Sequence, residues 1–349
     1  MILLTGGSGQ LGTAIRSRRD GLVAPTRSEL DLSRPQDLTS RLHQIEPSAI
    51  INCAGYTAVD RAEDEPDSAR VVNAIAVGVL AEYAATVGIP FVTFSTDYVF
   101  DGRADTPYLE SSPTAPINAY GRSKERGEQA ALAAHPGTLV VRTSWVISAT
   151  HRNFVTTIME RADAGPVNVV SDQLGCPTYA PDLAAATLAA FDTGATGILH
   201  LTNRGQASWY ELARTACNLA GIDPDRVRPI TSDEYPTKAA RPRYSVLGTE
   251  RLADLGLTPC RPWEDALALT ARSTAVRNGL PTAFRLRTWR PASYAFRRTR
   301  SARGGRSASG WGGRYRRAKR SPTGWLRSPR PARSCRMLCC RESRRGFGS

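Results

Sequence analysis

The feature that most limits the possible fold is a glycine-rich turn at the start of the chain. The apolar run ILLT at residues 2–5 leads directly into TGGSGQLG, which places Gly6, Gly9 and Gly12 at intervals of three. Glycines are needed where a tight turn brings the backbone close to a pyrophosphate and opens a helix whose free N–H groups face it. In this strand, turn and helix context the spacing indicates dinucleotide binding.

Short apolar runs alternate with longer amphipathic ones over the first 200 residues. The runs that we predict to be strands lie at 2–5, 21–25, 49–54, 90–95, 138–143, 167–170 and 197–202. The segments with helical periodicity lie at 10–19, 35–45, 68–87, 119–134, 154–164 and 181–191. Strands that are apolar throughout and separated by helices predict an α/β fold, a Rossmann-type doubly wound parallel sheet covered on both faces.

The same pattern predicts two regions. Residues 1–150 would form an NAD(P)-binding core, with strands returning to it from about 166 to 202. Residues 151–165 and 203–273 would form a smaller substrate-binding region, because the pattern beyond residue 203 is mostly helical with proline-rich connectors. The last helical pattern starts at Trp263, and we predict that it ends the domain.

Charge is distributed unevenly along the 349 residues, whose net charge is +14. Residues 1–273 carry 25 basic and 31 acidic side chains, whereas residues 274–349 carry 21 basic and one acidic. This last segment is rich in Arg, Gly, Ser and Pro without a sustained apolar period, so we predict a disordered basic tail. Its near lack of Lys, Asp and Glu is typical of a GC-rich coding region read out of frame. That origin is favoured over a nucleic-acid-binding tail.

The rest of the chain shows no pattern typical of a metal site, a disulfide framework or a membrane segment. Cys53, Cys176, Cys217 and Cys260 are far apart and form no CxxC pair or His cluster. The N-terminal run ILLT is too short for a signal sequence, and no apolar stretch approaches 18 residues. We therefore expect a cytoplasmic protein with no metal and no membrane partner, and with no nucleic-acid partner except through the tail.

A tyrosine and a lysine stand four residues apart in YGRSK, at Tyr120 and Lys124. On a helix this spacing stacks the two side chains on one face. A lysine, together with a positive nicotinamide, would stabilise the phenolate and bring the tyrosine pKa toward the working range. Thr96 ends a predicted strand about 25 residues earlier and could orient a ketone there. We predict Thr96, Tyr120 and Lys124 as the catalytic residues of a carbonyl reductase.

The end of the second predicted strand bears on the choice of cofactor. An acidic residue there would bind the adenosine ribose, but the chain has Arg27, which suits a 2′-phosphate, and no carboxylate before Glu29 and Asp31. This favours NADPH over NADH. The expected cofactor contacts are Gly6, Gly9, Gln10, Leu11, Gly12, Arg27, Asp31, Leu32, Ala54, Gly55, Tyr56, Tyr120 and Lys124.

The order of TGGSGQLG, NCAGYTAVDRAEDEP, STDYVFDG, YGRSKERGE, VRTSWV and VVSDQLGCPTY resembles the dTDP-4-dehydrorhamnose reductases, a branch of the extended short-chain dehydrogenase/reductase superfamily. The resemblance runs from Met1 to about Thr270. It implies reduction of the 4-keto group of dTDP-4-dehydro-β-L-rhamnose by NAD(P)H, with Tyr120 as proton donor and Lys124 as its tuner. It also implies a sugar pocket lined by Thr96, Asp97 and Trp145. Asn153 and Arg241 are weaker candidates for substrate contact, and Asp172 and Gln173 are expected to fix loop geometry.

Two departures and three alternatives accompany this resemblance. Some family members bind Mg²⁺ between subunits through a glutamate where this chain has Ala14, so a metal-bridged dimer is doubtful and a monomer or homodimer is expected. The tail replaces the short ending of the family. The alternatives are a nucleotide-sugar epimerase or dehydratase on the same scaffold, a non-catalytic NADP-binding regulatory subunit, and an RNA-binding protein driven by the tail. Tyr98 after Asp97, where dehydratases usually carry Glu, favours simple reduction.

Overall fold

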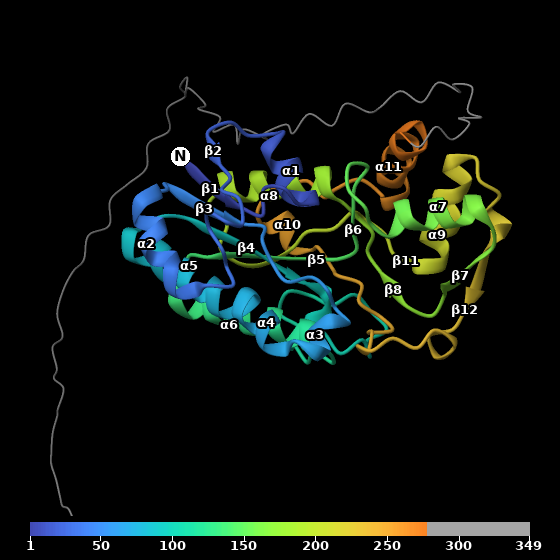
Figure 1. Cartoon of the computed structure of the whole chain (residues 1–349), viewed down its shortest axis with the longest axis horizontal. Coiled ribbons are helices and arrows are strands. Elements are labelled where there is room, and N and C mark those ends of the chain that lie inside the picture. Colours follow the sequence, from blue (N-terminus) through green and yellow to red (C-terminus); the bar gives the residue numbers. More distant parts are fainter. Residues whose placement is uncertain (278–349) are drawn as a thin grey trace, which may run out of the picture. The chain divides into compact units, whose positions relative to one another are not determined.

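The computed structural model describes residues 1–277 (Figure 1), so the predictions for the tail beyond Arg277 lie outside the described residues. A six-stranded parallel sheet forms the centre, in the order β10-β5-β4-β3-β1-β2. Its strands are β1 (Ile2–Thr5), β2 (Leu22–Val23), β3 (Ala49–Asn52), β4 (Phe91–Thr96), β5 (Leu139–Thr143) and β10 (Gly197–His200). Each begins and ends within two residues of its prediction, and the Rossmann-type α/β fold is confirmed.

Helices cover both faces of this sheet, because neighbouring residues of a strand point to opposite sides. Leu4, on one side, packs with α1 (Gln10–Arg16) and α8 (Ala180–Asp192). Leu3, on the other, packs with α2 (Pro35–Ile45), α5 (Ala76–Val87) and α6 (Ala119–Ala134). Figure 1 shows the two layers on either side of the sheet. Both faces of each strand are therefore buried, which explains why the strands are apolar throughout.

The helical run before β4 is longer than the others. It consists of α4 (Pro66–Arg70), a π-helical turn η1 (Val71–Ile75) and α5, after the short α3 (Arg61–Asp64). The run Pro66–Val87 is long and apolar enough to cross a membrane by length and composition. The side chains of Leu80, Ala81 and Ala84 are fully buried in the protein core, as in a covering helix of a folded domain.

A second core lies beside the sheet and is built from later parts of the chain. Its buried side chains come from α7 (Phe154–Ala164), α9 (Trp209–Ala220) and α11 (Trp263–Arg277), among others. The shorter elements here are β6 (Val146–Ile147), β8 (Leu174–Gly175), β9 (Thr178–Tyr179), β11 (Ala207–Ser208) and the 3₁₀ turns η3 (Pro224–Arg226) and η4 (Ser232–Glu234). The short helix α10 (Arg251–Asp254) instead packs through Leu252 with the core of the central sheet. The predicted substrate-binding region at residues 151–165 and 203–273 stays a prediction, since residues 1–277 belong to one compact unit.

One predicted strand pairs with a different partner strand than expected. β7 (Val167–Val170) forms, but it pairs in parallel with β12 (Val227–Ile230) and not with the central sheet. The prediction that strands return to the core from about residue 166 was therefore wrong for this strand and correct for β10, which pairs with β5. A strand partner depends on long-range contacts that local periodicity does not contain.

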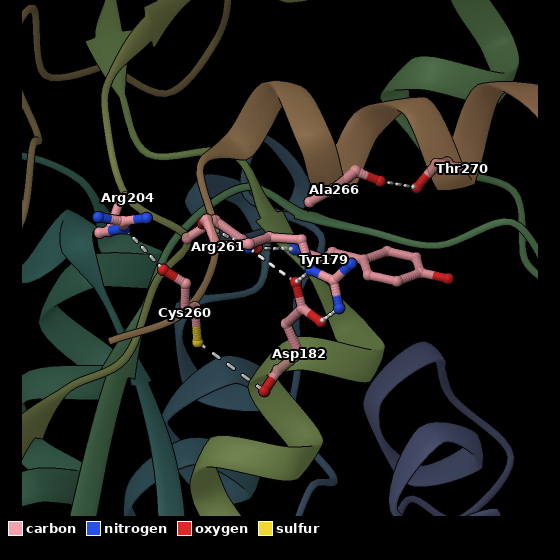
Figure 2. A network of polar contacts seen from close by, with 8 residues as sticks. Tyr179, Asp182, Arg204, Cys260, Arg261, Ala266 and Thr270 are labelled. Atoms are coloured by element: carbon pink, nitrogen blue, oxygen red, sulfur yellow. Dashed lines mark hydrogen bonds and ion pairs between the residues drawn. The ribbon is translucent and has the colours of Figure 1, made fainter. Parts of the chain in front are cut away.

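Polar contacts join α8 to Cys260 and Arg261, in the segment just before α11 (Figure 2). Asp182 on α8 forms an ion pair with Arg261, with 2.9 Å between Nε and Oδ2. The side-chain amide of Asn203 donates to the same carboxylate at 2.9 Å, and Arg204 Nε donates to the Cys260 carbonyl at 3.0 Å. These contacts join the sheet layer to the second core.

Neither edge of the central sheet is well suited to pair with a further strand. β2 is two residues long. At the other edge the guanidinium of Arg251, on α10, donates to the carbonyl oxygens of Ile198 in β10 and of Thr196 just before that strand. Carbonyls of an edge strand normally stay available for pairing, and here a side chain occupies two of them.

Candidate functional site

The glycines of the first turn are needed for different reasons. Gly6 has a φ of +66°, and a Cβ there would lie 2.6 Å from the Ala54 amide nitrogen. A Cβ on Gly12 would collide with the Gly6 carbonyl oxygen. At Gly9, by contrast, the nearest protein atom would be 3.4 Å away. Packing within the protein therefore explains Gly6 and Gly12, whereas Gly9 leaves room beside the backbone for a ligand.

A cavity of about 790 Å³ opens above this turn at the carboxyl ends of the strands. All thirteen residues predicted to contact the cofactor line it, namely Gly6, Gly9, Gln10, Leu11, Gly12, Arg27, Asp31, Leu32, Ala54, Gly55, Tyr56, Tyr120 and Lys124. Other lining residues that the sequence analysis did not predict as cofactor contacts include Arg16, Cys53, Ser95, His151 and Arg152. Cys53 and Ser95 lie at the ends of predicted strands, whereas no local pattern marks Arg16, His151 and Arg152.

Most of the charged side chains in the cavity lining are positive. Arg16, Arg27, Lys124 and Arg152 contribute cations, and Asp31 is the one acidic residue among the lining residues. Arg27 and Asp31 lie close together, with 3.4 Å between Nε and Oδ1. A cavity with excess positive charge and a glycine backbone at its floor suits a ligand with several phosphates. The residues present therefore fit a phosphorylated dinucleotide.

Tyr120 and Lys124 lie one turn apart on α6, whose first turn is capped by Asn118, with Gly121 N donating to the Asn118 side chain at 2.7 Å. Burial lowers the pKa of Lys124 to about 8, although Glu128 and Cys53 raise it. Burial also raises the pKa of Tyr120 to about 12, which the Thr96 hydroxyl partly offsets. In the chain alone the pKa of Tyr120 thus moves away from neutrality, and its expected lowering stays a prediction for the cofactor-bound protein.

The end of β4 carries a chain of hydroxyl and carboxyl groups. Thr96 Oγ1 donates to Asp97 Oδ1 at 3.0 Å, and Ser245 Oγ donates to Asp97 Oδ2 at 2.6 Å. Burial raises the pKa of Asp97 to about 7 against the effect of both hydrogen bonds. Thr96 and Asp97 are buried and are not among the cavity-lining residues, but Thr96 is close enough to Tyr120 to influence its pKa.

Trp145 adopts a strained backbone, with a φ of +45° that bulky residues rarely take. Its indole stacks on Trp209, with 3.6 Å between ring centroids and an interplanar angle of 9°. Phe154 packs against Trp209 at 4.5 Å. One face of Trp145 is therefore covered, and the residue is not among those lining the cofactor cavity. Its predicted sugar contact stays a prediction, limited to what that stacking leaves accessible.

The weaker candidates have structural partners. Arg241 pairs with Asp60, with 2.7 Å between Nη2 and Oδ2, which joins the 238–243 segment to the loop after β3. Asn153 caps α7. Asp172 accepts from the backbone and hydroxyl of Ser232, as expected for a loop-fixing residue. Arg241 and Asn153 therefore have local structural roles, whatever else they contact.

Asn73 is a site residue that the sequence analysis missed. It lies in η1, where its side-chain oxygen accepts from Tyr56 N at 2.8 Å and its amide donates to Ser123 Oγ at 2.9 Å. These bonds hold the Gly55–Tyr56 backbone of the cavity against α6. A π-helical turn often accompanies a functional site, but no sequence pattern marks this one.

Known proteins are similar to this chain over most of the described residues. Residues 1–276 match the protein family described as RmlD substrate binding domain. The chain is 43% identical over 274 residues to the dTDP-4-dehydrorhamnose reductase of Mycolicibacterium smegmatis, covering 76% of this chain and 83% of the relative. It is 44% identical over 277 residues to a probable dTDP-4,6-dihydroxy-2-methyloxan-3-one 4-ketoreductase of Streptomyces antibioticus, covering 76% and 92%.

A solved structure shows the same fold. The dTDP-4-dehydrorhamnose reductase of Bacillus anthracis, in complex with NADP, is 35% identical and has a TM-score of 0.74, covering 77% of this chain and 97% of its own. In the described part of the chain no three His, Cys, Asp or Glu side chains gather in a metal-binding cluster. The doubt about Mg²⁺ stays a prediction. From the matched family, the relatives and the fold together, the chain belongs to the RmlD family of dTDP-4-dehydrorhamnose reductases.

Proposed function

We propose that this protein reduces the 4-keto group of dTDP-4-dehydro-β-L-rhamnose with NADPH and forms dTDP-L-rhamnose. One observation carries the proposal: a single positively charged cavity contains the glycine turn, Arg27 and the Tyr120–Lys124 pair. Relatives named for this reduction, and one solved with NADP, support it. A cytoplasmic location accompanies the proposal.

The side chains have distinct roles in the proposed reaction. The bound cofactor supplies a hydride to C4 of the sugar. Tyr120 gives its proton to the carbonyl oxygen, and a pKa raised to about 12 keeps it protonated at neutral pH in the free protein. Thr96 orients that oxygen once its hydroxyl turns from Asp97. Lys124 holds the nicotinamide ribose and stabilises the charge left on Tyr120.

A second candidate substrate class has support from the relatives. The Streptomyces antibioticus relative is named for a different dTDP-linked 4-ketosugar, and a Streptomyces niveus relative, 41% identical, is named a dTDP-4-keto-6-deoxy-D-glucose reductase. The alternative is therefore reduction of another dTDP-4-keto-6-deoxysugar by the same residues. Epimerase, dehydratase and regulatory functions lack comparable support, since the named dehydratase structure is 19% identical and shows the fold alone.

NADPH oxidation with purified full-length protein tests the proposal. We expect turnover with dTDP-4-dehydro-β-L-rhamnose and slower turnover with dTDP-4-keto-6-deoxy-D-glucose. Tyr120→Phe should lose roughly 10²–10⁴-fold in kcat, the usual contribution of a general acid. Tyr235→Phe is the matched control, because Tyr235 is exposed. Undiminished turnover by Tyr120→Phe would exclude it as the proton donor, and preference for the second sugar would favour the alternative.

A further inference from the structure

The side chain of Gln10, in the first turn of α1, holds the segment 146–153 against the glycine turn. Its amide Nε2 donates to the Val146 carbonyl at 3.2 Å. Its Oε1 accepts from Ser148 Oγ at 2.8 Å and from Asn153 Nδ2 at 3.3 Å. Because these contacts occupy both the nitrogen and the oxygen of the amide, the Gln10 side chain connects the two segments, although the residue also lines the cavity.

His151 makes a second connection to the same turn. Its Nε2 lies 2.9 Å from the carbonyl oxygen of Ser8, between Gly7 and Gly9. A carbonyl oxygen only accepts, so Nε2 carries the proton in this contact. The other ring nitrogen lies 2.8 Å from Thr150 Oγ1. The segment 148–153 is thus fixed to the glycine turn at Ser8 and at Gln10, which are two residues apart.

Arg152 follows in this fastened segment and lines the cavity. Its side chain is exposed, and its one hydrogen bond among the described residues is a long contact of 3.5 Å from Nε to Thr157 Oγ1. No ion pair involves Arg152 within residues 1–277, whereas Arg27 already has Asp31 beside it. Most of the Arg152 guanidinium is therefore available to a ligand on the glycine turn.

We infer that Arg152 is a cofactor-binding residue that contacts the pyrophosphate above the glycine turn, and that the segment 148–153 is fastened to that turn to position it. The inference rests on the proposed cofactor. The anchor at Ser8 favours the pyrophosphate over the 2′-phosphate, because Arg27 follows β2, on the other side of the turn. Arg16 also belongs to that side, since its Cδ would lie 3.5 Å from a Cβ on Gly7, beside Ala24.

Fluorescence titration of the full-length protein with NADPH and with NADH tests the inference without requiring turnover. Arg152→Ala should raise the Kd of both cofactors by a similar factor of roughly ten, as expected for a lost charge-assisted hydrogen bond. Arg161→Ala is the matched control, because Arg161 is an exposed arginine of α7 that does not line the cavity.

Each outcome has a definite meaning. Unchanged Kd values for both cofactors in Arg152→Ala would refute the inference and leave the proposed function intact. Weaker binding of NADPH alone would place Arg152 at the 2′-phosphate and overturn the pyrophosphate assignment. If the unmodified protein binds neither cofactor, the proposed function itself fails, and the inference fails with it. Because Arg152 is exposed, its loss should leave the melting temperature unchanged, which verifies that the variant is folded.

Discussion

Replacing Asp97 with asparagine should stabilise the protein increasingly as the pH rises from about 5 to about 8. Asp97 is 2% exposed, and burial raises the pKa of its carboxyl from an ordinary value of 3.8 to about 7. The folded protein therefore binds a proton at Asp97 that the unfolded chain has already released between these two values. Stability contributed by the protonated form is lost as the pH rises through 7. Asparagine stays neutral and avoids this loss.

The magnitude follows from the two pKa values. One pKa unit corresponds to about 1.4 kcal/mol, so the ionised carboxyl costs up to about 4 kcal/mol well above pH 7. Part of this cost is already present at about pH 5, because the unfolded carboxyl ionises near 3.8. Between about pH 5 and 8 the variant should gain about 2.5 kcal/mol of unfolding free energy relative to the unmodified protein.

Urea unfolding at several pH values measures this difference. The comparison cancels every other titrating group, and the hydroxyls of Ser245 and Thr96 can rotate to suit an amide. Asp105→Asn is the control, since Asp105 is exposed and its replacement removes no buried carboxyl. A difference between Asp97→Asn and the unmodified protein that stays constant with pH would refute the reasoning, whatever its size.

Two further predictions concern other charges. Glu128→Gln should lose about 3–5 kcal/mol of unfolding free energy, because it leaves the 2% exposed Arg142 without the carboxylate that it binds at 2.6 and 2.8 Å. Urea unfolding measures this loss, with replacement of the exposed Glu264 by Gln as the control. A loss below about 1 kcal/mol would contradict the prediction. Arg16→Ala should weaken NADPH binding several-fold and leave NADH binding unchanged, because Arg16 lies near the end of β2, where the 2′-phosphate is expected. Equal effects on both cofactors in the fluorescence titration would argue against a contact between Arg16 and the 2′-phosphate.

Much of the fold was predictable from the sequence because the signals are local. The alternation of apolar runs and amphipathic segments placed the central strands within two residues, and the glycine turn indicated a cavity that the predicted cofactor residues do line. The pairing of β7 with β12 was not predictable. Residues 167–170 look like any buried strand, and their partner lies about 60 residues later in the chain.

The same difference between local signals and long-range contacts applies to the site residues. Tyr120 and Lys124 were predictable because one helical turn relates them. Arg152 and Asn73 were not, because each reaches the site through contacts with segments far away in the sequence. The pKa of Tyr120 depends on burial by the whole fold, which the spacing of two residues does not contain.

The hydrogen bonds from Arg251 to the carbonyls beside β10 bear on how copies of this protein meet each other. A parallel sheet with an open edge can recruit a strand from another molecule and grow into an aggregate. Here a guanidinium occupies the acceptors that an incoming strand would need, and the opposite edge strand is two residues long. Edge-to-edge growth of the sheet is thereby disfavoured, and a homodimer would be expected to assemble through helices or loops.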